Sequence, residues 1–250
     1  AIFADIIVPY DYGIKQVIPD RLQGPSLKHL FGTDDLGRDL FSRVIHGSRS
    51  SLVLGILTTA VATLIGGFLG GICAYYGNRV DNIIMRLLDV ITSIPSTLLS
   101  LSIVAALGPG IRNLVIAITV SRVPTFARVI RSAVLNIVNQ EYIEAAKAGG
   151  TRNLRIMLRH VYPNAMSPII VQCTMSISQL ILQAAGLSFL GMGMQPPAPE
   201  WGALLNSARD FMRTAPHLML FPGIAIVLAA LAFNLVGDGL RDAFDPRLKS

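Results

Sequence analysis

The side chains best suited to specific ionic contacts are concentrated in one short segment, residues 141–163, which reads EYIEAAKAGGTRNLRIMLRHVYP. Four lysines and arginines lie between Lys147 and Arg159, close to Glu144, in a chain in which only 14% of the residues are charged. Carboxylate, ammonium and guanidinium groups form charge-assisted hydrogen bonds with groups of opposite charge. The chemistry that this segment offers is therefore reversible binding.

Residues for covalent or metal-assisted catalysis form no recognisable pattern. The sequence contains neither a G-x-S-x-G nor an H-E-x-x-H motif, and it has no G-x-x-x-x-G-K-[ST] loop for a nucleotide phosphate. Its four histidines are scattered, and Cys73 and Cys173 lie in apolar stretches without a C-x-x-C spacing. We therefore expect no enzymatic activity, no metal and no cofactor of its own.

The composition is that of a membrane protein. Only 14% of the residues are charged, against roughly one quarter in soluble domains, and 52% are hydrophobic. Each long uncharged run meets the ~20 residues that a helix needs to cross a bilayer. The runs are residues 50–78, 90–111, 161–199 and 214–237. They lack a period of two, which disfavours a β-barrel, so the fold class expected is all-α, a polytopic membrane helical bundle.

The first 49 residues divide into two parts. The apolar start stops at Pro9, too early to span, so residues 1–8 are interpreted as the end of a first transmembrane helix that begins upstream. Residues 9–49 are polar, and apolar positions between Leu36 and Ile45 recur at helical spacing after the N-cap residues Thr33, Asp34 and Asp35. An amphipathic helix at the membrane surface is one interpretation; a helix packed on the protein itself is the other.

Five further spans are expected within residues 50–237. The first carries several glycines that would let another helix approach closely, the second has a kink at Pro95, and the third contains Arg122. Charges inside spans usually face a water-filled path or a partner, so Asp89 and Arg122 are predicted to line a substrate pathway. The alternative is that Asp89 pairs with Arg86 while Arg122 extends toward the membrane surface.

Alternate loops differ slightly in their content of lysine and arginine. The richer side contains residues 77–89, 122–162 and 238–250, and basic residues favour the cytoplasmic side. The basic segment and a tail at 238–250 are therefore predicted to be cytoplasmic, and residues 9–49 external. The net charge of +6 fits a membrane with anionic inner lipids and does not require nucleic acid as a partner.

The basic segment itself predicts two helices with a hinge. Residues 141–148 favour a helix, Gly149 and Gly150 end it, and Thr151 can cap a second helix over residues 152–160. Pro163 is placed to begin the next spanning helix. The mixed apolar and basic surface of residues 141–163 suits docking on a partner, although an ordinary cytoplasmic loop could have the same composition.

One motif in this segment is specific. Glu144-Ala145-Ala146, three residues, Gly150, nine residues and a final Pro163 resemble the EAA loop of binding-protein-dependent ABC importer permeases, here spanning about 136–163. The family's I-x-L-P is replaced by His160-Val161-Tyr162-Pro163, as in the peptide and nickel branch. Four further segments agree with the same branch: GTDDLGRDLFSR, FARVIRSAVL, LSFLGMGMQPPAPEWG and GDGLRDAFDPRLKS. The chain therefore resembles the C-type permease of a dipeptide or oligopeptide importer over nearly its whole length.

The resemblance implies a type I importer fold in a bacterial or archaeal plasma membrane. It also implies a second, homologous permease subunit, two cytoplasmic ATPases that bind ATP and magnesium, an external binding protein and a peptide substrate. The residues that it implies for coupling to the ATPase are Glu144, Ala145, Ala146, Gly150, Arg155, His160 and Pro163. Nickel chelates or glutathione are alternative substrates, and an ion-coupled secondary transporter or an intramembrane enzyme are the alternative classes.

Overall fold

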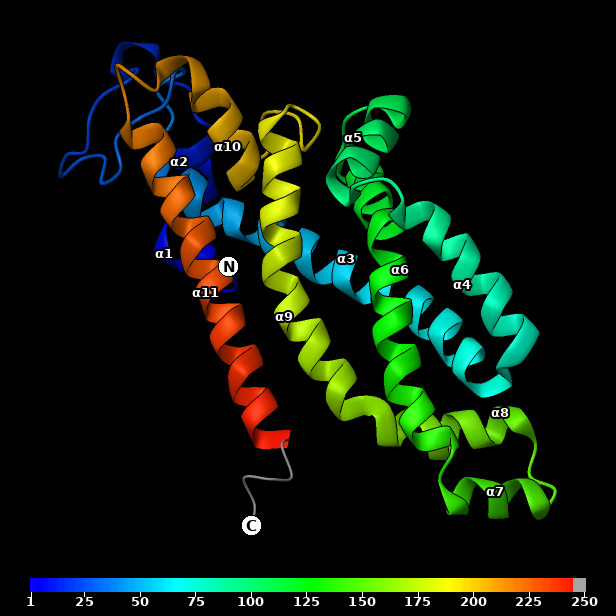
Figure 1. The fold of residues 1–250 in the computed structure, drawn as a ribbon. Helices are drawn as coiled ribbons and strands as arrows, with labels where there is room; N and C mark the ends of the chain where they lie inside the picture. Colours follow the sequence, from blue (N-terminus) through cyan, green and yellow to red (C-terminus); the bar gives the residue numbers. More distant parts are fainter. Residues whose placement is uncertain (245–250) are drawn as a thin grey trace. The chain divides into compact units, whose positions relative to one another are not determined.

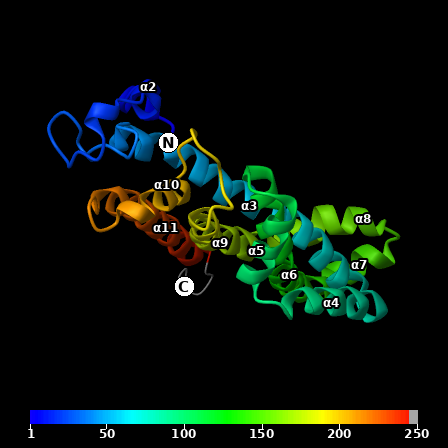
Figure 2. The ribbon, with the colours of Figure 1, turned by 90° about the horizontal axis from the view of Figure 1, so that it is seen from above.

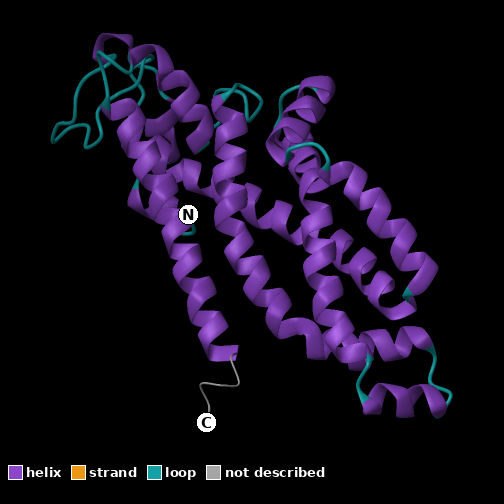
Figure 3. Ribbon diagram, in the orientation of Figure 1, coloured by secondary structure: helices purple, strands orange, loops and turns teal. Residues whose placement is uncertain are grey.

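The computed structural model describes residues 1–244, and these are almost entirely helical (Figures 1 and 3). Among the described residues, β-structure is limited to one isolated antiparallel β-bridge between Thr33 and Asp39. The all-α prediction is therefore confirmed. The predicted cytoplasmic tail at 238–250 falls partly inside α11, which continues to Phe244, and its residues 245–250 lie outside the described residues.

Four helical stretches are long and apolar enough to cross a membrane. They are α3 (Leu40–Tyr76), α6 (Ile111–Val138), the continuous stretch Asn153–Phe189 and α11 (His217–Phe244). A fifth span is possible in length if α4 (Asn78–Thr92) and α5 (Ser96–Leu107) are counted together, but these two helices are bent by 79°. The kink predicted at Pro95 is thus a full break: α4 ends at Thr92 and α5 begins directly after Pro95, whose ring disfavours helical backbone at the residue before it.

The contacts divide the chain into two compact units. The first consists of Ala1–Leu57, Leu101–Ala117 and Ser178–Ala232, and the second of Thr58–Ser100, Ile118–Ile177 and Phe233–Ser250. Each unit is assembled from segments that are far apart in the sequence.

The first unit contains the polar N-terminal segment. Its short helices are α1 (Ala4–Ile7), α2 (Tyr10–Ile14) and η1 (Ile18–Asp20). The Phe31 ring stacks on Phe221 of α11, with 3.9 Å between ring centroids, and meets Phe41 edge-on at 4.9 Å. Arg38 donates to Asp34 over 2.7 Å, and both side chains are less than one-tenth exposed. The segment is therefore a packed part of this unit.

The helix predicted over residues 36–45 starts later than expected. Asp39 accepts a hydrogen bond of 2.8 Å from the backbone N–H of Ser42, as an N-cap residue does, and α3 begins at Leu40. Asp34 instead accepts from the backbone N–H groups of Leu36 and Arg38 in the preceding turn. No break separates residues 40–49 from the following apolar run, so the prediction of a separate surface helix is wrong.

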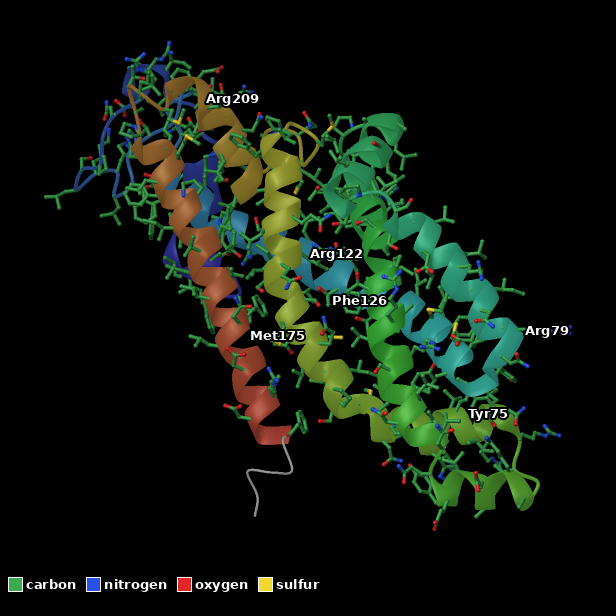
Figure 4. The ribbon with its side chains drawn as sticks, viewed as in Figure 1. Tyr75, Arg79, Arg122, Phe126, Met175 and Arg209 are labelled. Carbon is green, nitrogen blue, oxygen red and sulfur yellow. The ribbon has the colours of Figure 1, made fainter. Side chains whose placement is uncertain are left out.

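The second unit is built around close contact between α3 and α6. A Cβ added at Gly66 would lie 2.7 Å from Phe126 Cβ and 2.9 Å from the backbone nitrogen of Ala127 (Figure 4). Gly70 meets the same side of α6 at Ala127 and Arg131. The glycines expected to permit close helix packing therefore do so here.

Candidate functional site: the α7–α8 element

The predicted hinge forms as expected at its first half. The helix α7 (Glu141–Ala148) has the predicted bounds and ends in a motif closed by two backbone hydrogen bonds, from Gly150 N to Lys147 O and from Thr151 N to Ala146 O. These are the two bonds of the Schellman motif, which requires a left-handed residue. Gly150 supplies it with φ of +74°, and its missing Cβ would meet no atom within 4 Å. The glycine is thus needed for its backbone conformation and not for close approach.

The second half differs from the prediction. Thr151 does not cap the next helix: α8 (Asn153–Ile156) follows Arg152 as the N-cap residue, without a side-chain cap. The chain then passes through a π-helical turn, η2 (Met157–Val161), into α9 (Tyr162–Phe189). The predicted start of the spanning helix at Pro163 is thus one residue from the observed start at Tyr162, but the helical path enters α9 without a break. The Pro163 ring crowds the carbonyl four positions earlier, that of Arg159, and the wider π turn at that point accommodates it.

A buried apolar cluster fixes the inner side of this α7–α8 element. Ile143 of α7 and Ile156 of α8 are fully buried, and they pack with residues from α3, α6 and α9. Burying a side chain of this size contributes ~2 kcal/mol. The other members of the cluster are Ala74, Ile130, Val134, Val138, Val161, Ala165 and Ile169. The element is thus attached to the ends of three long helices of its unit (Figure 1).

The outer side carries most of the residues predicted for coupling. Glu144, Ala145, Gly150, Arg155 and Pro163 are exposed, whereas Ala146 and His160 are partly buried. Apolar side chains are exposed beside them: Leu154 is 68% exposed and Leu158 59%. The two helices lie side by side in both views of the ribbon (Figures 1 and 2). An exposed surface that mixes apolar, acidic and basic groups is suited to docking on another protein.

Sequence reasoning missed the contacts between this element and α3. The Tyr75 hydroxyl donates to Asn153 Oδ1 over 2.8 Å, and Lys147 Nζ lies 5.2 Å from the centroid of the Tyr75 ring (Figure 4). The Tyr162 hydroxyl donates to the carbonyl of Gly67 over 3.0 Å. A tyrosine at the end of an apolar run is typical of a membrane interface, so its type alone did not indicate a partner.

The two charges predicted for a pathway lie on different helices. Asp89 on α4 accepts a hydrogen bond of 2.7 Å from Arg128 Nη2 of α6, and Arg128 also donates to Thr92. The alternative of a pair with Arg86 is therefore replaced by a pair between helices. Arg122 lies on α6, partly buried, six residues before Arg128 (Figure 4). A second pair joins the same helices, since Arg131 Nε donates to Asp81 over 2.6 Å.

The loop before α10 (Trp201–Ala208) holds a buried carboxylate. Glu200 is 1% exposed and caps α10 by accepting from the backbone N–H groups of Gly202, over 2.8 Å, and Ala203, over 2.9 Å. Ser51 Oγ also donates to it, and Trp201 Nε1 donates to the carbonyl of Val44 over 2.9 Å. Burial raises the pKa of Glu200 more than these hydrogen bonds lower it. The short η3 helix (Arg209–Phe211) follows α10 (Figure 4).

Three known permease proteins align with the whole of this chain. The dipeptide transport system permease protein DppC of Alkalihalophilus pseudofirmus is 48% identical over all of this chain and 82% of its own length. The di/tripeptide permease DppC of Pseudomonas aeruginosa is 46% identical over all of this chain and 84% of its length. The glutathione permease GsiD of Pectobacterium atrosepticum is 47% identical over all of this chain and 83% of its length.

Solved structures agree in fold. An inward-facing MetNI methionine ABC transporter matches with a TM-score of 0.65 at 18% identity, over 80% of this chain and 95% of that one. An amino acid ABC transporter matches with a TM-score of 0.60 at 20% identity, over 83% and 95%. The type I importer fold is therefore confirmed. Residues 62–250 also match the model of one family, and the chain belongs to it: the binding-protein-dependent transport system inner membrane components.

Proposed function

We propose that this chain is one of two homologous permease subunits that together form the translocation pathway of an ATP-driven importer of short peptides. The peptide substrate is supported by relatives named for dipeptides and for di- and tripeptides, which align over the whole chain. Glutathione is the second candidate, because a relative of similar identity is named for it. Glutathione is itself a tripeptide, so both candidates are short chains with charged ends.

The α7–α8 element is proposed to dock on a separate cytoplasmic ATPase. The observation that carries this role is its two-sided construction: Ile143 and Ile156 are buried against the membrane helices, while Glu144, Arg155 and Leu154 face outward. A loop that served only to keep positive charge inside the cell would need neither the buried anchors nor exposed leucines. Movement of a docked ATPase would therefore reach the spanning helices through a rigid connection.

The remaining partners follow from this assignment. ATP and magnesium would be bound by two ATPase subunits, because this chain has no phosphate-binding loop in its sequence. An external binding protein would deliver the peptide, and the membrane would be the inner membrane of a bacterium, the source of the relatives compared above. Asp89 and Arg122 are proposed to border the pathway. Membrane lipid is the other partner, and no nucleic acid is expected.

Site-directed crosslinking tests the docking role. In a variant with Cys73 and Cys173 replaced by serine, a cysteine at Ala148 or Leu154, both exposed on the α7–α8 element, should crosslink to the ATPase that copurifies with the wild-type complex. A cysteine at Leu27, which is fully exposed in the predicted external segment, is the matched control. The docking role is wrong if neither α7–α8 position crosslinks to the ATPase, or if the Leu27 position crosslinks to it equally well.

A further inference from the structure

One aromatic side chain on a spanning helix contacts both helices of the docking element. Tyr75 is the penultimate residue of α3, and its ring packs on the buried cluster that holds the element. Its hydroxyl donates to Asn153 of α8, and its ring faces the ammonium group of Lys147 of α7. The contact to Lys147, at 5.2 Å from the centroid, is within the range of a cation–π interaction. Tyr75 therefore joins α7, α8 and α3 at one point.

A second contact lies further along the same face of α3. Positions 67, 71 and 75 are spaced by four residues, which places them in one row along a helix. Tyr162, the first residue of α9, donates from its hydroxyl to the carbonyl of Gly67. Its ring passes over Gly71, where an added Cβ would collide with the hydroxyl oxygen. The α7–α8 element and the helix that follows it are thus attached to α3 at two successive levels.

This geometry constrains how the element can move. A tyrosine has two rotatable side-chain bonds, and the Tyr75 ring is held by contacts on the cluster, the ammonium group and the amide oxygen. A displacement of α7 and α8 therefore either breaks these contacts or carries the end of α3 with it. Because α3 also packs closely on α6 at Gly66, the displacement passes into the spanning helices of this unit.

We propose that Tyr75 is a positioning residue that transmits the displacement of the α7–α8 element to α3, and thereby couples ATP hydrolysis to opening of the pathway. This inference rests on the proposed function, since it needs an ATPase that moves the element. It adds a residue outside the EAA loop to the coupling machinery and gives it a defined route. The contribution of Tyr75 should be visible as transport per ATP, whereas a residue that only supports the fold would change assembly.

The test compares three variants in the complete complex, reconstituted with its ATPases and with the binding protein carrying a dipeptide. Tyr75→Phe removes only the hydrogen bond to Asn153, and Tyr75→Leu also removes the ring under Lys147. Tyr76→Phe is the matched control, because Tyr76 is the adjacent residue and is 53% exposed. The measurements are the ATPase retained per permease and the peptide imported per ATP hydrolysed.

We expect all three variants to retain their ATPases. Tyr75→Phe should lower the peptide imported per ATP about fivefold, the effect of a typical hydrogen bond, and Tyr75→Leu should lower it more than tenfold, whereas Tyr76→Phe should equal wild type. Adding Asn153→Ala to Tyr75→Phe should cause little further loss, because both remove the same bond. Normal transport per ATP in Tyr75→Leu would overturn the inference, as would loss of the ATPases in Tyr75→Phe.

The failure of this inference is separable from failure of the proposed function. If Gly150→Val and Glu144→Lys release the ATPases while Tyr75→Leu couples normally, docking stands and the route through Tyr75 is wrong. If crosslinks from Ala148 and Leu154 do not reach the ATPase, the docking role itself is wrong, whatever the Tyr75 variants do.

Discussion

Substitution of Gly150 separates the effect of backbone conformation from the effect of side-chain size at the hinge of the α7–α8 element. Gly150 has φ of +74°, and nothing lies within 4 Å of the Cβ that a substitution would add. The cost of a side chain is therefore the cost of left-handed backbone, ~1–2 kcal/mol for a residue other than glycine. Since 1.4 kcal/mol corresponds to about tenfold in an equilibrium constant, Gly150→Ala should weaken ATPase retention about tenfold, and the β-branched Gly150→Val should weaken it further.

Two matched variants sharpen this prediction. Asparagine tolerates the left-handed region better than alanine does, so Gly150→Asn should be milder than Gly150→Ala although its side chain is larger. Gly149 has an ordinary φ of −73°, and its nearest neighbour for an added Cβ is the carbonyl of Ala145 at 3.4 Å, so Gly149→Ala should have little effect. Titrating the copurified ATPase onto each permease in lipid vesicles measures the series. Retention that follows side-chain size, with asparagine worse than alanine, would refute the reasoning.

Three further predictions concern other parts of the chain. Gly66→Leu should lower the stability of the subunit by ~1–3 kcal/mol, because the new side chain would overlap Phe126 and Ala127. Ile65→Ala, at a neighbouring position that is 44% exposed, should lower the stability less, and thermal melting in detergent measures both variants. Arg122→Leu should reduce peptide uptake and leave the complex assembled; unchanged uptake would remove Arg122 from the pathway. Burial raises the pKa of Glu200 above its ordinary value of 4.5, so between pH 4.5 and the raised pKa the folded state holds a proton that the unfolded state releases, and stability should fall as pH rises through that window. Glu200→Gln should flatten the dependence of the melting temperature on pH in this window, and an equally steep dependence would assign it to other groups.

Features that depend on neighbours in sequence were predictable. Glu141–Ala148 form a helix because helix-favouring residues are followed by two glycines, and the positive φ of Gly150 follows from the same local pattern. The long apolar runs predicted spanning helices because a minimum length and the absence of charge are properties of one segment. The glycines of α3 indicated a close helix partner, although the sequence did not say that the partner would be α6.

Features that depend on distant residues were not predictable. Asp89 pairs with Arg128 and not with the nearby Arg86, since α4 and α6 bring together positions that are 39 residues apart. Tyr75 meets Asn153 for the same reason, across 78 positions. The failure at Thr151 has a different cause: threonine is a common N-cap residue, but here its backbone N–H closes the end of α7 by donating to the carbonyl of Ala146, and Arg152 is the N-cap residue of α8. The helical path from α8 then continues through the π turn into α9, and the buried cluster holds residues from both sides of that turn.

Uptake into sealed vesicles tests the central claim most directly. The wild-type complex would be reconstituted with the ATPase side facing the lumen, and a radiolabelled dipeptide would be supplied outside with its binding protein. We predict uptake when ATP and magnesium are trapped inside, no uptake when ATP is omitted, and no recovery when a proton gradient is imposed instead. Uptake that persists without ATP and follows the proton gradient would contradict the account and would identify an ion-coupled carrier.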